Sequence, residues 1–158
     1  MLAGVGARLA AYLLDSIVLI IISFATILIY SAFVPLPDLS EFRSLAAWNN
    51  AVTEWQTLPI LLNFVISIIY HTYFLTVQAG QTPGKAALNI RIIKLNGTPL
   101  TIWNAIVRNQ IGYTVSAIVF MFGFLWILGD DKRQGWHDKL AGTLVVKARQ
   151  ATLETPLA

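Results

Sequence analysis

Long apolar stretches separated by short polar segments dominate the chain. No Lys, Arg, Asp or Glu occurs in residues 16–37, 55–84 or 109–129. Each stretch exceeds the ~20 residues that a helix needs to cross a bilayer. The pattern therefore predicts spans at about 9–34, 58–77 and 109–129. The expected fold class is an α-helical integral membrane protein with two to three transmembrane helices.

The segment between the first two spans predicts a short amphipathic helix over residues 39–56. Asp38 and Glu41 have the spacing of a capping box, and apolar residues then recur every three to four positions. Such a helix is expected to lie on the bilayer surface, with Trp48 and Trp55 at headgroup level.

Two segments carry the alternation of β-strands. Residues 88–102 alternate apolar and polar positions around Asn96-Gly97, the commonest two-residue hairpin turn, and residues 143–147 form a β-branched run. Because an isolated hairpin is only marginally stable, we expect both segments to combine in a small three-stranded cytoplasmic sheet.

The loop charges predict the orientation in the membrane. Residues 78–108 carry four cations and no acid, and the segment after residue 130 is also rich in Lys and Arg, whereas the first loop has one Arg against three acids. The positive-inside rule therefore places the N-terminus and both later segments in the cytoplasm. One alternative makes residues 103–129 a re-entrant hairpin, bent near Gly112 or Gly123; the other has three full spans, the third over residues 109–129, and an outside tail.

Composition agrees with a membrane protein and excludes a soluble one. Hydrophobic residues make up 56% of the 158 residues and charged residues only 12%, against ~25% in soluble domains. Without cysteine there can be no disulfide or thiolate metal site. The net charge of +3 is read as loop charge that orients the spans, so no nucleic-acid partner is expected. Residues 1–150 are expected to form one domain, followed by a flexible tail at 151–158.

The N-terminal apolar segment is not expected to be a cleaved signal. Arg8 is its only cation, and Asp15 stands directly before the apolar run. These two residues lie two helical turns apart and share a helix face with a stripe of alanines. Asp15 is thus expected to face a neighbouring helix, either as a functional carboxylate or as part of a packing lock.

A polar stripe on the second predicted span is a further candidate site. Asn63, Ser67 and His71 recur every four residues, a pattern that suits either cation or proton handling or interhelical hydrogen bonding. No nucleotide loop, metal-ligand spacing or nucleophile with its base is recognisable. The sequence therefore predicts no enzyme, no cofactor and no metal.

Two polar turns complete the candidates. The segment Gln81-Thr82-Pro83-Gly84-Lys85 lacks the glycines and hydroxyl of a phosphate loop, and is interpreted as a membrane-boundary turn in which Gly84 and Lys85 face headgroups. Residues 130–139 mix acids and bases, which suits either a solvated interfacial turn or docking against Arg8 or Arg108.

Together these motifs resemble the RDD family of small bacterial and archaeal membrane proteins, named for one arginine and two aspartates. The resemblance rests on three ordered segments: residues 8–15, residues 80–93 with Arg108, and residues 135–146. It implies that Arg8 and Asp15 are the first two name residues, and Asp138, in preference to Asp131, the third. The position after Lys85, often basic in the family, is Ala86 here.

The resemblance implies an integral protein of a prokaryotic inner membrane without a settled activity. Transport has been suggested for the family, and some members have been linked to cation and proton exchange. Our first hypothesis is a non-enzymatic protein that binds or moves a small ligand or cation, in a homo-oligomer, at a polar centre of Arg8, Asp15, His71, Arg108 and Asp138. The alternative is an accessory or assembly subunit of a larger membrane complex.

Overall fold

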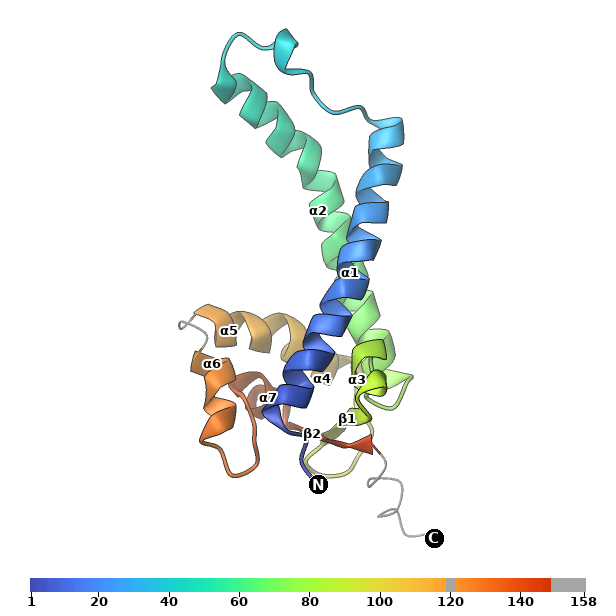
Figure 1. Ribbon diagram of the computed structural model, residues 1–158, viewed down its shortest axis with the longest axis vertical. Helices are drawn as coiled ribbons and strands as arrows, with labels where there is room; N and C mark the ends of the chain where they lie inside the picture. The colour runs from blue at the N-terminus through green and yellow to red at the C-terminus, as the bar shows by residue number, and fades with distance from the viewer. Residues whose placement is uncertain (119–121, 149–158) are drawn as a thin grey trace. The chain divides into compact units, whose positions relative to one another are not determined.

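The computed structural model describes residues 1–118 and 122–148 (Figure 1). The chain divides into two compact units. The larger unit combines Met1–Ser16 with the described residues from Ile68 onward, and the smaller unit is Ile17–Ser67. Two long helices each contribute residues to both units, whereas all short helices after residue 80 and both strands belong to the larger unit.

The two long helices confirm that the first two predicted spans are apolar helices of membrane-spanning length. Helix α1 runs from Val5 to Phe33 and helix α2 from Leu45 to Thr76. Both are long and apolar enough to cross a membrane. At 1.5 Å per residue they extend about 43 and 48 Å, which exceeds the ~30 Å hydrocarbon core of a bilayer. Most of their large apolar side chains are exposed, as lipid-facing residues would be.

The predicted surface helix over 39–56 is not a separate element. Leu39–Glu41 forms one 3₁₀ turn, and α2 then continues from Leu45 without a break through the second predicted span. The helix start is marked by Ser44, whose Oγ accepts a hydrogen bond from the backbone N–H of Ala47 at 3.2 Å. No residue between this cap and Pro59 ends a helix, and extending a formed helix is easier than nucleating a second one.

Tryptophan side chains hold the connection inside the smaller unit. Nε1 of Trp55 donates to the carbonyl oxygen of Val34 at 2.9 Å, and Nε1 of Trp48 donates to that of Pro37 at 3.3 Å. The Trp55 ring also packs against Tyr30 at 5.1 Å between centroids. Both indoles therefore satisfy backbone carbonyls that follow the end of α1.

The sheet has two strands among the described residues, and its topology differs from the predicted hairpin. Strand β1, Ile90–Lys94, pairs antiparallel with β2, Thr143–Lys147, so that Ile92 lies opposite Val145 (Figure 1). The residues after β1 do turn at Asn96-Gly97, but they lead to a helix instead of a returning strand. Pro99 has no N–H to donate to a ladder, and this disfavours the predicted strand there.

The N-terminal residues lie beside β2, where a third strand would pair. Leu2 forms an antiparallel bridge with Val146, and the N–H of Ala3 donates to the carbonyl oxygen of Val145 at 2.9 Å. The N–H of Lys147 donates in turn to the carbonyl oxygen of Met1 at 3.1 Å. Residues from the beginning and the end of the described chain are thus joined through their backbones.

The third predicted span is a bent helical segment. Helix α4, Ile102–Ile106, continues through a π-helical stretch, Val107–Gly112, into α5, Tyr113–Ile118. Helix α6, Phe122–Leu125, and a 3₁₀ turn, Trp126–Leu128, follow at an angle of 107°. Residues 119–121 of this predicted span lie outside the described residues.

Two glycines allow close packing around this bend. A Cβ on Gly123 would lie 2.5 Å from Cα of Ser116, so α5 and α6 approach each other where a side chain would not fit. A Cβ on Gly112 would lie 2.8 Å from Cα of His137, which leaves room there only for glycine. The bend therefore lies close to Gly123. Gly112 instead allows the π-helical stretch to contact helix α7, Trp136–Ala141.

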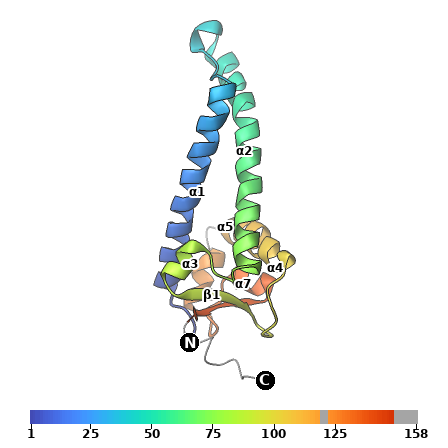
Figure 2. The same ribbon diagram turned by 90° about the vertical axis from the view of Figure 1, so that its right-hand side faces the viewer.

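The larger unit has a small apolar core. Helix α3, Pro83–Ala87, leads into β1, and Figure 2 shows both elements near the N-terminus. The buried core residues come from the segment before α1, from α1 itself, the end of α2, both strands and α4: Ala3, Ala11, Leu75, Ile90, Ile92, Ala105 and Val145. The predicted flexible tail at 151–158 lies outside the described residues.

Candidate functional site

The carboxylate of Asp15 is buried on α1 and receives four hydrogen-bond donors. Oδ1 accepts from the hydroxyl of Tyr70 at 2.9 Å and from the backbone N–H of Gly84 at 2.8 Å. Oδ2 accepts from the hydroxyl of Thr82 at 2.5 Å and from Nζ of Lys85 at 3.3 Å. We call these five residues the Asp15 cluster. The carboxylate is expected to face a neighbour, and these contacts identify its neighbours.

Local sequence explains how the turn before α3 reaches Asp15. Thr82 is the N-cap of α3, and Pro83 occupies the first helical position, where its missing N–H costs nothing. Gly84 follows, and a Cβ there would lie 2.3 Å from the carbonyl oxygen of Ala11 on α1. Only glycine allows the turn to come close enough for its N–H to meet the carboxylate.

Lys85 does not face headgroups, contrary to the sequence-based expectation. Its side chain is buried, and its Nζ lies 3.3 Å from Asp15 and 3.1 Å from Oγ1 of Thr82. Burial lowers the pKa of Lys85, and the negative charge of Asp15 opposes this shift only in part. The lysine is thus a desolvated cation whose nearest anion is Asp15.

A second cluster forms around Asp138, whose side chain is fully buried. Nη1 of Arg8 donates to Oδ2 at 3.0 Å, and Nη1 of Arg108 donates to Oδ1. The same guanidinium nitrogen of Arg108 contacts Oγ1 of Thr143 at 2.6 Å. Nε2 of His137 lies 3.5 Å from Oδ2. We call these five residues the Asp138 cluster.

Asp138 combines a helix cap with ion pairing. It stands at the third position of α7 and accepts the N–H of Gly135 at 3.1 Å. Burial by itself would raise the pKa of Asp138, but the surrounding positive charge, above all that of Arg108, outweighs this effect and lowers it. The carboxylate therefore stays ionised and ties α1, the π-helical stretch and α7 together.

His137 forms a buried pair with Ser116 that the sequence did not suggest. Oγ of Ser116 lies 3.4 Å from Nδ1 of His137, and the Tyr113 ring meets the imidazole edge to face at 4.7 Å. Burial, followed by the repulsion of Arg108, lowers the pKa of His137 to about 3, so the ring is neutral. Ser116, His137 and Asp138 are the residue types of a catalytic triad, but Ser116 is 0% exposed, so its hydroxyl is closed to a substrate in this structure.

The structure sorts the predicted polar centre into two groups. Arg8, Arg108 and Asp138 come together in one, while Asp15, Gly84 and Lys85 come together in the other. His71 is next to the second group, because its ring lies edge-on to Tyr70 at 5.2 Å. Asp131, the alternative third name residue, is exposed.

Sequence reasoning missed three hydroxyl groups that belong to the two clusters. Tyr70, Thr82 and Thr143 each place a hydroxyl in a cluster, and none stands at a distinctive spacing from its acid. A signal existed for Thr82, since threonine directly before proline is typical of a helix N-cap. Among residues 1–118 and 122–148, no group of three His, Asp or Glu side chains is placed to hold a metal ion.

Two membrane-length apolar helices and two buried ion-pair clusters define an integral membrane protein with an organised polar interior. The RDD family model matches residues 2–142, and the chain belongs to the RDD family. The chain is 28% identical over 155 residues to an uncharacterized protein, YxaI, of Bacillus subtilis (strain 168), over 91% of this chain and 96% of that protein. No solved structure matches the chain significantly.

Proposed function

We propose that this protein is non-enzymatic and that it binds or moves a small cation, in exchange for a proton, at the Asp15 cluster. The observation that carries the proposal is the 3.3 Å pair between a buried carboxylate, Asp15, and a buried ammonium, Lys85. Buried ionisable groups in a membrane protein are expensive and commonly mark ion pathways. The hydroxyls of Thr82 and Tyr70 add oxygen ligands beside the carboxylate.

The charge balance of the Asp15 cluster suggests how exchange works. While Lys85 is protonated, it neutralises Asp15 and no further cation is needed. Because burial lowers the pKa of Lys85, its proton is released more readily than that of an exposed lysine. Loss of this proton leaves the carboxylate without its counter-ion, and a monovalent cation then restores neutrality. Proton and cation thus compete for the same negative charge.

The Asp138 cluster has a structural role in this proposal. Asp138 accepts from both Arg8 and Arg108, so its charge is already compensated. Arg8 is on the same helix as Asp15, two turns nearer the N-terminus. The cluster therefore holds the beginning of α1 in place so that Asp15 remains opposite Lys85.

Charge and backbone pairing support a cytoplasmic larger unit and a re-entrant bent segment. The described residues of the larger unit contain nine Lys and Arg against four Asp, whereas residues 17–67 contain one Arg against three acids. Strand β1 precedes the bent segment 102–128, and its partner β2 follows it. Because paired strands lie on one side of the bilayer, this segment would enter the membrane and return.

Transport would require more than one copy of the chain. Two spans and one re-entrant segment rarely enclose a pathway. Only 6% of the most apolar 18-residue stretch of α1 is buried within the chain, so a large apolar surface is available to lipid or to a second copy. We therefore propose a homo-oligomer in the inner membrane as the working form.

Flux measurements in proteoliposomes test the proposal. The reconstituted protein is expected to move protons in response to an imposed Na⁺ or K⁺ gradient, read by a pH-sensitive dye in the lumen. Asp15→Asn and Lys85→Gln are expected to abolish this flux. Asp131→Asn removes an exposed acid from the same unit and serves as the matched control. No flux in the wild type with either ion, or full flux in Asp15→Asn, would contradict the proposal.

The exposed apolar faces also favour a second candidate, an accessory or assembly subunit of a larger complex. Such a subunit needs helix surface for its partner but no ion pathway. Purification in mild detergent with mass measurement separates the candidates. A stable hetero-complex supports the accessory role, and a monodisperse homo-oligomer supports the transport role.

A further inference from the structure

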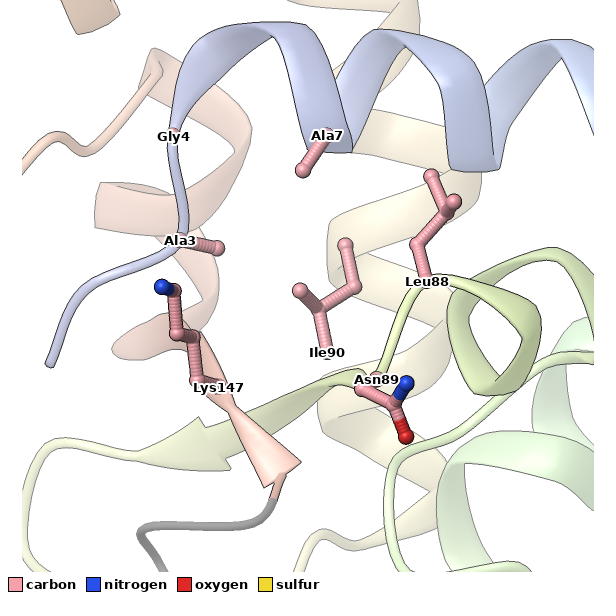
Figure 3. A pocket seen from close by; sticks show the side chains of 7 residues that line it. All are labelled: Ala3, Gly4, Ala7, Leu88, Asn89, Ile90 and Lys147. Carbon is pink, nitrogen blue, oxygen red and sulfur yellow. The ribbon is translucent and has the colours of Figure 1, made fainter.

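A pocket of about 340 Å³ lies beside the first turn of α1, and none of its lining residues belongs to either ion-pair cluster (Figure 3). Four aliphatic side chains and one glycine form its walls: Ala3, Ala7, Leu88, Ile90 and Gly4. Asn89 and Lys147 complete the lining, and both are exposed. Its volume is at the lower end of the range for ligand pockets, which are mostly apolar with few polar groups.

The position of Lys147 gives the pocket a positive edge. In the sheet register Lys147 is directly opposite Ile90, so both side chains lie on the same face of the sheet. That face also presents Val145, which is buried. Figure 3 shows the ammonium end of Lys147 on the Ala3 side of the pocket. The lining contains no acid, so no residue of the pocket wall neutralises this cation.

A bilayer crossed by α1 would place the pocket near its headgroup layer. Helix α1 is 29 residues long and extends about 43 Å, close to the ~40–45 Å of a bilayer with its headgroup layers. When the helix spans the membrane, its first turn, which contains Ala7, is at headgroup level. The exposed apolar side chains of Leu9 and Leu13, further along α1, then extend toward the hydrocarbon.

We propose that this pocket binds one anionic phospholipid. The aliphatic wall would take the upper part of an acyl chain, and Lys147 would contact the phosphate of the headgroup. A zwitterionic lipid would fit the same wall but would gain less from the cation, because its own positive charge offsets that of the phosphate. The site is separate from the Asp15 cluster, and the proposal does not depend on cation exchange.

Native mass spectrometry of the delipidated protein in detergent tests the site. The probes are phosphatidylglycerol and phosphatidylcholine with identical acyl chains, each added in turn. One lysine near an anionic surface contributes about a fivefold difference in affinity. The wild type is therefore expected to bind phosphatidylglycerol about fivefold more tightly, and Lys147→Gln is expected to lose this preference. Lys132→Gln changes the charge equally at an exposed position outside the pocket, and should retain it.

Two further arms separate binding in this pocket from nonspecific binding elsewhere on the protein. Ala7→Leu places a larger side chain in the pocket and should weaken binding of both lipids. If that variant fails to fold, the comparison of Lys147→Gln with Lys132→Gln still decides. Inorganic phosphate in excess should not displace phosphatidylglycerol, because it lacks an acyl chain. The proposal is overturned by equal binding of both lipids to the wild type, by equal losses in the two lysine variants, or by displacement with phosphate.

Discussion

Gly84 donates its backbone N–H to Oδ1 of Asp15 at 2.8 Å, across a contact between the α3 turn and α1 that has no room for a side chain. A Cβ on Gly84 would lie 2.3 Å from the carbonyl oxygen of Ala11 and 2.9 Å from the carboxylate itself. The two backbones therefore approach as closely as their atoms allow. This approach is what brings Lys85, the next residue, to the buried acid.

Gly84→Ala is expected to destabilise the protein. The added methyl group must displace backbone atoms of α1, and overpacking of this kind costs about 1–3 kcal/mol or more. Unfolding by denaturant in detergent micelles, followed by far-UV circular dichroism, measures the change. Gly129→Ala is the control, because nothing lies within 4 Å of a Cβ at that position. Equal stability of the two variants would show that the turn does not approach α1 this closely.

Asp138→Asn should destabilise the larger unit by about 3–5 kcal/mol, because it leaves the charges of Arg8 and Arg108 buried without their anion. The same unfolding experiment measures this loss. Asp130→Asn removes the acid of an outer ion pair with Lys139 and is expected to have little effect. If Asp138→Asn is no more harmful than Asp130→Asn, the two arginines must have other anions.

Stability should fall as the pH is lowered from 6.5, and His137 is the expected cause. The pKa of His137 is about 3 in the folded protein, against 6.5 for an unperturbed histidine. Between these values the unfolded chain binds a proton that the folded chain does not, so acidification favours unfolding by up to about 1.4 kcal/mol per pH unit. Above pH 6.5 His137 is neutral in both the folded and the unfolded chain, so its titration no longer lowers the free energy of unfolding.

Unfolding free energies between pH 4.5 and 8 check the histidine prediction. Because the pKa of Asp138 is lowered, the stability that depends on its ionised carboxylate is lost only below this pH range. His137→Asn removes the titrating group and should flatten the slope relative to wild type. An unchanged slope in that variant would assign the pH dependence to another residue.

A disulfide can test whether the N-terminus and β2 lie on one side of the membrane. Leu2 and Val146 face each other as a pair without mutual hydrogen bonds, a geometry with Cα atoms about 4.5 Å apart. This separation suits a disulfide, and the chain contains no other cysteine. The double variant Leu2→Cys with Val146→Cys should therefore cross-link under mild oxidation, seen as a mobility shift reversed by reductant.

The matched control for this cross-link is Leu2→Cys with Leu128→Cys, which pairs the N-terminus with an exposed residue at the end of the bent segment. It is expected to remain unlinked within the monomer. Three full spans would place the C-terminal strand outside and the N-terminus inside. The absence of the Leu2–Val146 link in membranes would favour that arrangement.

The apolar pattern was sufficient to predict the two long helices but not where the second begins. Charge-free runs of more than 20 residues can satisfy their backbone in a bilayer only as helices, so α1 and the later part of α2 followed directly. The break expected before residue 58 was wrong because amphipathic and fully apolar stretches have the same helical backbone. A change in surface polarity marks a change of environment and does not end a helix.

Strand pairing could not be read from local signals. Asn96-Gly97 is a genuine turn, with Gly97 at φ +73°, yet the partner of β1 is a strand some fifty residues later. Turn propensity acts over four residues, whereas the pairing depends on the bent segment 102–128 returning the chain beside β1. The bridge from Leu2 to Val146 depends on the same return.

The identities of the buried acids came from the sequence, and their partners came from the fold. A lone carboxylate next to an apolar run, such as Asp15, needs a hydrogen-bond donor, because burying it unpaired costs too much free energy. This requirement follows from the local sequence alone. That the donor is Lys85 and not Arg8, which shares the helix, depends on Gly84 letting a turn reach α1. The sequence by itself thus determined that polar groups would be buried in a membrane-spanning chain. Only the tertiary structure decided how they pair, because ion pairing acts over a few ångströms between residues about 30 to 130 positions apart.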